Sequence, residues 1–201
     1  MQSTNPQAPA PKFQNKTDLW LISHSPRRIQ LLQDLGFTFK VGEAHVEEVY
    51  PPSLAGEQIP VFLSRLKADH AKVPFADNTL IITADTVVLS GGKVLGKPSG
   101  EAEAREMLRL LSGKTHQVIT GVTLRSSAKT ISFSEQTDVT FSLLTDEIID
   151  HYIATYKPFD KAGAYGIQEW IGMVGVESIN GCFYNVMGLP VHRLFREMQM
   201  F

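Results

Sequence analysis

The stretch Leu19-Trp20-Leu21-Ile22-Ser23-His24-Ser25-Pro26-Arg27-Arg28 changes within a few residues from an apolar run to hydroxyl and guanidinium side chains. The apolar run predicts a strand. Ser25 followed by Pro26 predicts the N-cap and the first residue of a helix, because a proline at that place needs no free N–H. Leu31, Leu32 and Leu35 supply the apolar face of this helix, and Gly36 ends it.

Two serines and two arginines therefore gather at the start of one helix. Such an end carries unpaired backbone N–H groups and the positive pole of the helix dipole, so it binds phosphate without a glycine-rich loop. A polyanion site at Ser25, Arg27 and Arg28 is one interpretation. A well-capped amphipathic helix with solvated arginines is the other, and the stretch alone does not separate them.

The composition is that of an ordinary globular protein with one sizeable core. The chain has 201 residues, of which 43% are hydrophobic and 20% are charged, and its formal net charge is -2. No sequence-wide basic field is present, so neither nucleic acid nor an anionic membrane is expected as a partner. The single cysteine, Cys182, excludes an intramolecular disulfide and a cysteine-based zinc site, and it suits a cytoplasmic protein.

The beginning of the chain has a different composition from the rest. Prolines at positions 6, 9 and 11 stand among Gln, Asn and Ser without apolar periodicity, which predicts a disordered tail over residues 1–17 and a single domain over residues 18–201. This tail lacks the layout of a signal peptide, and no apolar run of the sequence is long enough to cross a bilayer.

Residues 80–89 form a nearly continuous apolar run that predicts a central strand covered on both faces. Asp85 interrupts it, and a carboxylate in such surroundings needs a partner or a metal ion. Gly91-Gly92 then predicts a hairpin turn that pairs Ser90 with Lys93 and Thr86 with Lys97. This register brings an ammonium group near Asp85, although a simple ion pair closing the hairpin would leave the same pattern.

The remaining chain alternates strand-like and helix-like segments, which indicates an α/β fold with a mixed sheet. In one helix, Lys67 follows Leu63 by one turn beside the buried face, where it must either snorkel or bind something. The predicted strands are 37–41, 117–124 and 130–144; the predicted helices are 59–72, 99–112, 145–157 and a final one after Pro190; residues 173–179 and 182–187 are predicted to pair as a hairpin.

Residues 160–168 contain too many small residues for a stable helix or strand, and their glycines allow a ligand to approach the backbone. The amide of Gln168 both donates and accepts, which matches the edge of uracil or thymine. A turn-rich connection with an incidental pair between Asp160 and Lys161 is the alternative.

The acidic residues point to one type of chemistry. Glu48 and Asp85 offer carboxylate oxygens for a divalent cation, and Mg²⁺ and Mn²⁺ are the hard cations that accompany phosphates. HxxEH, cysteine-rich and GxxxxGK[ST] signatures are missing from the sequence. Metal-assisted hydrolysis of a phosphoanhydride fits this inventory best.

Six ordered blocks from Leu19 to the C-terminus resemble the Maf family of nucleoside triphosphate pyrophosphatases. They are Ser23-His24-Ser25-Pro26-Arg27-Arg28, Ala84-Asp85-Thr86-Val87-Val88, Gly96-Lys97-Pro98, Leu111-Ser112-Gly113-Lys114-Thr115-His116, Asp160-Lys161-Ala162-Gly163-Ala164-Tyr165-Gly166-Ile167-Gln168 and Val186-Met187-Gly188-Leu189-Pro190. The fifth block resembles the dTTP and UTP pyrophosphatase branch. His24, where small residues are common, is a minor departure.

This resemblance implies a two-lobed, elongated α/β fold with a deep cleft, related to the inosine triphosphatase group, and a homodimer. It also implies cleavage of a nucleoside triphosphate between the α and β phosphates with a divalent cation. The proton acceptor of the family falls on Asp85. Specificity positions fall on Arg27, Thr86 and Gln168, and positions handling triphosphate and metal fall on Ser25, Arg28, Glu48, Lys67 and Lys97.

Two other functions remain open from the sequence. One is a house-cleaning pyrophosphatase for modified or purine nucleotides, since base preference rests on few contacts. The other is a non-catalytic nucleotide-binding regulator of division, which a metal-dependent release of pyrophosphate would exclude.

Overall fold

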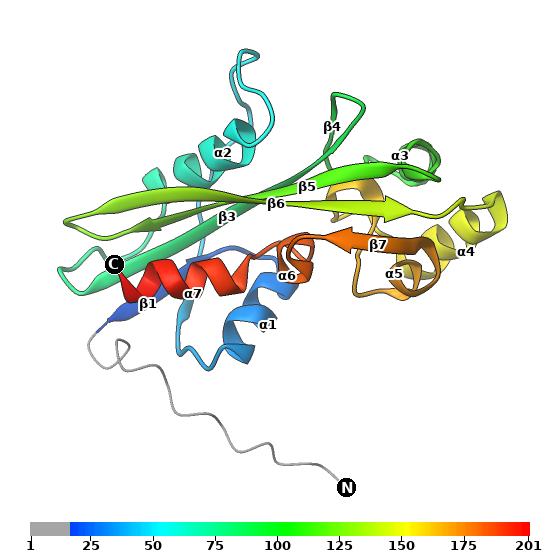
Figure 1. The fold of residues 1–201 in the computed structure, drawn as a ribbon. Helices are drawn as coiled ribbons and strands as arrows, with labels where there is room; N and C mark the ends of the chain where they lie inside the picture. Colours follow the sequence, from blue (N-terminus) through cyan, green and yellow to red (C-terminus); the bar gives the residue numbers. More distant parts are fainter. Residues whose placement is uncertain (1–16) are drawn as a thin grey trace, which may run out of the picture.

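The centre of the structure is a mixed sheet of seven strands (Figure 1). The computed structural model describes residues 17–201, so the predicted tail lies outside the described residues except for Thr17. The strand order is β2-β1-β3-β5-β6-β7, with β4 beside β3; β1 runs parallel to β2 and β3, and the other pairs are antiparallel. The strands are β1 Asp18–Ile22, β2 Lys40–Gly42, β3 Thr79–Ser90, β4 Lys93–Leu95, β5 Thr115–Arg125, β6 Thr130–Phe141 and β7 Val176–Asn180.

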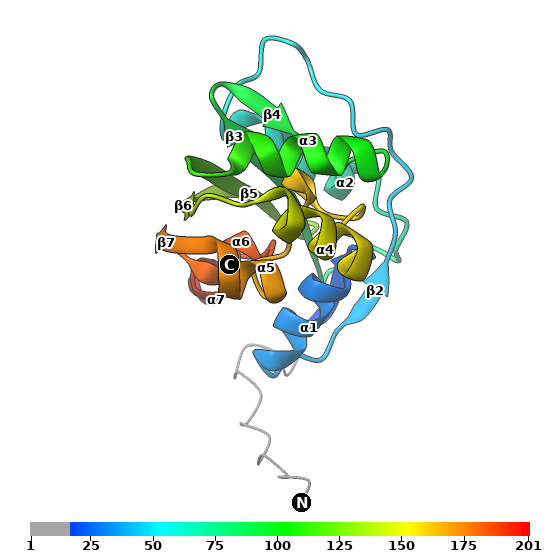
Figure 2. The same cartoon turned by 90° about the vertical axis from the view of Figure 1, so that its right-hand side faces the viewer.

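Helices cover both faces of this sheet (Figures 1 and 2). One core cluster joins α1 and α7 to β1, β3, β5 and β6, another joins α2 to β3 and β5 from the opposite face, and a third surrounds α3 and α4 at one end. The helices are α1 Pro26–Asp34, α2 Gln58–Asp69, α3 Glu101–Leu111, α4 Asp146–Tyr156, α5 Trp170–Gly175, α6 Phe183–Val186 and α7 Val191–Gln199, with a 3-10 turn η2 at Ala162–Ala164. The α/β class and the mixed sheet are therefore confirmed.

The local signals placed most elements correctly. Helix α1 begins at Pro26 after Ser25, and Gly36 follows its end with a φ of 79°, a left-handed conformation that glycine adopts freely. Thr145 caps α4 by accepting a hydrogen bond from the backbone N–H of Ile148. The predicted strand at 37–41 forms only over Lys40–Gly42.

The predicted hairpin over 173–187 is wrong. Residues 173–175 belong to α5, and residues 183–186 form α6. Strand β7 pairs with β6, which is distant in sequence, and after Gly181 the chain is held by Thr137, whose hydroxyl bonds both the N–H and the carbonyl of Cys182. The turn signal at Asn180-Gly181 thus marks a strand-to-helix connection.

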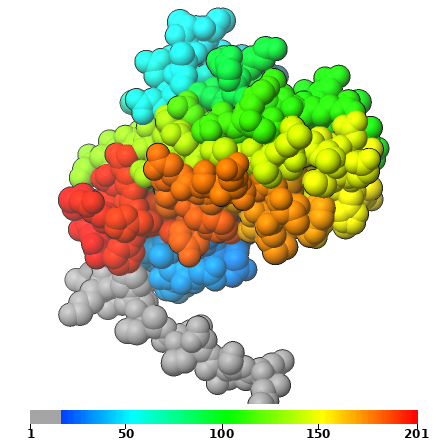
Figure 3. All heavy atoms as spheres, turned by 45° about the vertical axis from the view of Figure 1, so that its right-hand side comes forward, coloured from blue at the N-terminus to red at the C-terminus, as the bar shows by residue number. Residues whose placement is uncertain are grey.

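The C-terminal segment packs onto the rest of the domain. Figure 3 shows residues 170–201, coloured orange to red, on one face of the molecule above α1. Within residues 17–201, no helix combines the length and the apolar character that a membrane span requires.

Candidate active site

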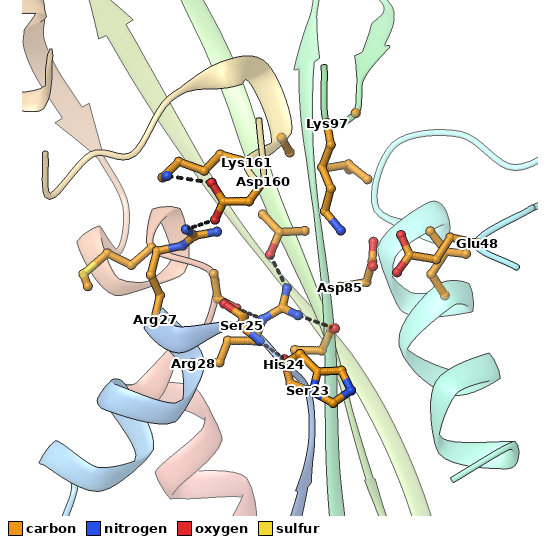
Figure 4. Close-up of a pocket in the computed structure, with 18 of the residues that line it drawn as sticks. Ser23, His24, Ser25, Arg27, Arg28, Glu48, Asp85, Lys97, Asp160 and Lys161 are labelled. Atoms are coloured by element: carbon orange, nitrogen blue, oxygen red, sulfur yellow. Dashed lines mark hydrogen bonds and ion pairs between the residues drawn. The ribbon is translucent and has the colours of Figure 1, made fainter. Parts of the chain in front are cut away.

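A pocket of about 530 Å³ lies beside the part of the edge of β3 that pairs with no other strand. Strand β1 pairs with β3 over residues 79–83 and β4 pairs over 88–90, so residues 84–87 have no strand neighbour on that side among the described residues. The gap admits the N-terminus of α1 and the segments around 160–168 and 186–188 (Figure 4). All the site residues predicted from the sequence line this pocket: Ser25, Arg27, Arg28, Glu48, Lys67, Asp85, Thr86, Lys97 and Gln168.

Asp85 has the ion-pair partner that its burial demands. The residue is 7% exposed, and its Oδ1 lies 2.6 Å from Nζ of Lys67. The same ammonium lies 2.8 Å from Oε1 of Glu48, so Lys67 bridges both carboxylates. The sequence predicted that Lys67 either snorkels or binds a partner, and the structure shows it bound to both carboxylates.

Burial and neighbouring charges act differently on the two carboxyl groups. Burial raises the pKa of Asp85 above its usual value, although Lys67 and Arg28 oppose the shift. Burial also acts on Glu48, but there the hydrogen bond and charge of Lys67 prevail, with help from Lys97 and Arg28, and the pKa is lowered. Burial therefore makes Asp85 a stronger base than an exposed aspartate, whereas the cations around Glu48 make it a weaker base than an exposed glutamate.

Gly121, which the sequence reasoning missed, allows α2 to reach Asp85. It pairs with Asp85 in the sheet, and a Cβ built there would lie 2.3 to 2.4 Å from backbone atoms of Pro60 and Val61. Only a glycine lets the first turn of α2 lie so close to β5, and this contact carries Lys67 toward β3. A glycine inside an apolar strand is the signal that could have indicated the close approach.

Arg28 connects three parts of the pocket wall. Its Nε and Nη1 each donate to a backbone carbonyl at 2.8 Å, those of Gly188 and Ala84, and Nη2 donates to the hydroxyl of Thr86 at 3.0 Å. Burial lowers the pKa of this guanidinium, while the charge of Asp85 opposes the change. Arg28 therefore replaces part of the strand missing from the edge of β3.

The other residues at the start of α1 have different surroundings. Ser25 lies at the N-cap in an extended conformation, and its side chain makes no capping hydrogen bond. The Nη1 of Arg27 lies 2.9 Å from Oδ2 of Asp160, which joins the helix to the segment 160–168. The helix N-terminus predicted from the sequence therefore opens into the pocket beside cationic side chains.

Thr86, Lys97 and Gln168 lie at three other positions around the pocket. The hydroxyl of Thr86 also bonds that of Thr120 at 2.8 Å. The predicted pairing of Ser90 with Lys93 is confirmed, but the ladder ends at Leu95, so Thr86 and Lys97 do not pair. Lys97 still extends toward Asp85 in Figure 4, and Gln168 is exposed at the pocket wall.

The donor atoms in the pocket suit a hard divalent cation. Asp85 and Glu48 offer carboxylate oxygens on either side of one ammonium group. Across residues 17–201, no set of three or more His, Cys, Asp and Glu side chains is grouped to hold a metal. Two carboxylates fit Mg²⁺ or Mn²⁺ when water and phosphate oxygens complete the coordination.

A family model described as "Maf-like protein" matches residues 18–201. The chain belongs to this family. Curated relatives named dTTP/UTP pyrophosphatase include those of Phocaeicola vulgatus, 52% identical with 92% of this chain and 96% of the relative covered, and Cytophaga hutchinsonii, 51% identical with 92% and 84% covered. The relative of that name in Porphyromonas gingivalis is 49% identical, with 92% and 95% covered. The Maf-like match therefore spans every residue that lines the pocket.

Proposed function

We propose that this protein hydrolyses dTTP and UTP between the α and β phosphates, releasing the nucleoside monophosphate and pyrophosphate. The names of its relatives, at about 50% identity over most of the chain, support this substrate class. The observation that carries the proposal is the buried Asp85, bridged by Lys67 at the open edge of β3.

Asp85 acts as the general base of this reaction. Its raised pKa makes it a better proton acceptor than an exposed aspartate, while the ammonium of Lys67 favours its ionised form. It takes a proton from a water molecule that attacks the α phosphorus. The bond from that phosphorus to the bridging oxygen breaks, and its electron pair leaves with pyrophosphate.

Cationic groups stabilise the charge that develops on the leaving group. Arg28, Lys67 and Lys97 converge on the pocket beside the N-terminus of α1, where Ser25 offers a hydroxyl. A divalent cation, Mg²⁺ or Mn²⁺, held by Glu48 and Asp85 would neutralise phosphate charge when bound.

Base selection is assigned to Gln168, which is exposed at the pocket. The amide of Gln168 donates to a carbonyl oxygen and accepts from the ring N–H of uracil or thymine. Arg27 and Thr86 complete the set of proposed specificity residues, and both line the same pocket.

The same proposal extends to organisation and location. Residues 18–201 form one two-lobed domain that works as a homodimer, as the family resemblance implies, and light scattering of the purified protein tests the dimer. A cytoplasmic location is supported by the single cysteine, which suits a reducing compartment.

A substrate panel tests the function. Purified protein is given dTTP, UTP, dCTP, GTP and ITP with Mg²⁺ or Mn²⁺, and pyrophosphate and monophosphate are measured, with EDTA as the control. Highest kcat/KM for dTTP and UTP with release of pyrophosphate supports the proposal. Preference for ITP would favour a house-cleaning role, release of orthophosphate would contradict the bond assignment, and binding without turnover would favour a regulator.

A further inference from the structure

The turn that carries Gln168 is closed by its own backbone. The N–H of Glu169 donates to the carbonyl of Gly166 at 3.0 Å, with Ile167 and Gln168 between them. Ile167 is 5% exposed and belongs to a core cluster, whereas Gln168 is exposed at the pocket. One side of the turn is thus fixed in the core, while Gln168, on the other side, is exposed at the pocket.

Both ends of this turn are held by side chains. The hydroxyl of Tyr152, on α4, accepts a hydrogen bond from the N–H of Gly166 at 3.0 Å and donates one to Oε2 of Glu169. The other carboxylate oxygen of Glu169 lies 3.1 Å from Nζ of Lys161. Tyr152 is fully buried and Lys161 is 7% exposed, so these contacts are shielded from water.

Gly166 leaves the space that these side chains occupy. A Cβ at this position would lie 2.8 Å from Cδ of Glu169 and 3.0 Å from Cε of Lys161. Because Glu169 is held from two directions, it has little freedom to move aside. An alanine here would therefore disturb the contact between Glu169 and Lys161 without removing either side chain.

The contacts continue to the second proposed specificity residue. Lys161 Nζ lies 2.7 Å from Oδ1 of Asp160, whose Oδ2 lies 2.9 Å from Nη1 of Arg27. Figure 4 shows Arg27, Asp160 and Lys161 joined in this order at one side of the pocket. A continuous set of charged contacts therefore joins the turn of Gln168 to the start of α1.

We propose that Tyr152, Lys161 and Glu169 form a positioning frame that fixes the amide of Gln168 and so sets the base preference of this site. This inference rests on the proposed function. Tyr152 and Glu169 lie outside the pocket lining and act through Gln168, and Lys161, which lines the pocket, holds Glu169 in place.

Replacing Glu169 with glutamine is the sharpest perturbation, because the shape is kept while the charge is lost. If the amide oxygen of the new side chain faced Tyr152, its NH₂ group would face the Lys161 ammonium, and two donors would meet. In the reverse orientation the Tyr152 proton would lose its acceptor. Either way one contact of the positioning frame is broken, and the turn is released on one side.

The experiment compares steady-state kinetics of Glu169→Gln, Tyr152→Phe and Gly166→Ala with wild type on dTTP and dCTP. We expect KM for dTTP to rise about tenfold, kcat to stay within about threefold, and the preference for dTTP over dCTP to fall toward that of Gln168→Ala. The control is Asp150→Asn, also on α4, which removes an ion pair of 2.8 Å with Arg105 of α3, away from the pocket, and should keep the wild-type preference.

Wild-type turnover of dTTP, measured first, tests the proposed function separately from the positioning frame. Thermal melts identify variants that keep the fold, and any one of the three that folds decides the result. A folded variant with wild-type KM and wild-type preference would overturn the inference. An unchanged preference in Gln168→Ala would overturn it too, because the frame would then position a residue that does not read the base.

Discussion

Replacing Lys67 with methionine tests the arrangement around Asp85. The substitution keeps a long flexible side chain but removes the ammonium that bridges Asp85 and Glu48. The side chains of Lys67 and Asp85 are 14% and 10% exposed, so the remaining carboxylate would be left with little solvent. Removing one partner of such a buried pair costs about 3–5 kcal/mol of unfolding free energy.

The penalty should depend on pH with a definite sign. Burial already raises the pKa of Asp85, and loss of the opposing Lys67 charge raises it further. Below the ordinary pKa of an aspartate, both the folded and the unfolded chain bind the proton, so the extra penalty vanishes. As the pH rises toward the raised pKa of the folded state, only the folded chain keeps the proton, and the penalty grows.

Urea unfolding of both proteins at pH 5 and pH 8 measures this effect. We expect the Lys67→Met penalty to be larger at pH 8. The matched control is Lys40→Met, whose pair with Asp18 has side chains 59% and 29% exposed, so this substitution should change the urea midpoint much less. A Lys67→Met midpoint equal to wild type at pH 8, or a larger penalty at pH 5, would refute the reasoning.

Two further predictions concern residues buried around the sheet. Gly121→Ala should lower the free energy of unfolding by more than about 3 kcal/mol, because its Cβ would overlap the backbone at Pro60. The control, Gly96→Ala, has open space around it and should change the urea midpoint little; equal midpoints for the two variants would argue against the close approach. Desolvation lowers the pKa of buried His116 to about 4. The unfolded chain therefore takes up a proton first as the pH falls, so the stability that is present above pH 6.5 should be lost toward pH 4, with a total loss of roughly 3 kcal/mol. His116→Gln should show a shallower decline between pH 7 and pH 5 in urea unfolding, and an identical slope would count against a neutral buried imidazole.

Local patterns in the sequence predicted much of the fold. Pro26 after Ser25 encodes the start of α1 because the geometry of a helix N-terminus is local, and the apolar run around Asp85 encodes a covered strand because its surroundings are apolar on both faces. The spacing of Leu63 and Lys67 placed the lysine beside the buried face of α2. Each of these signals is contained in a few neighbouring residues.

Contacts between distant segments could not be predicted in the same way. The partnership of Lys67 with Asp85 depends on where α2 crosses the sheet, which Gly121 on another strand permits. The turn at Asn180-Gly181 suggested a hairpin because its signal is local. The strand that pairs with β7 is β6, in which the partner of Ile179 is Val139, forty residues earlier in the chain.

The site, like the fold, was predictable where its signals are local and not where distant segments meet. The residue types that handle phosphate were visible as a cluster around Arg28, but its contacts with the carbonyls of Ala84 and Gly188 depend on three segments meeting. Glu169 and Tyr152 carried no recognisable motif of their own, because their role depends on a turn that forms only in the folded chain.

The most direct test of the central claim is kcat/KM for dTTP in purified Asp85→Asn. The substitution keeps the size of the side chain and removes the base, so the account predicts a loss of about 100- to 10,000-fold while the protein still shows a cooperative melt. Near wild-type turnover by the folded variant would contradict the assignment of Asp85 as the proton acceptor.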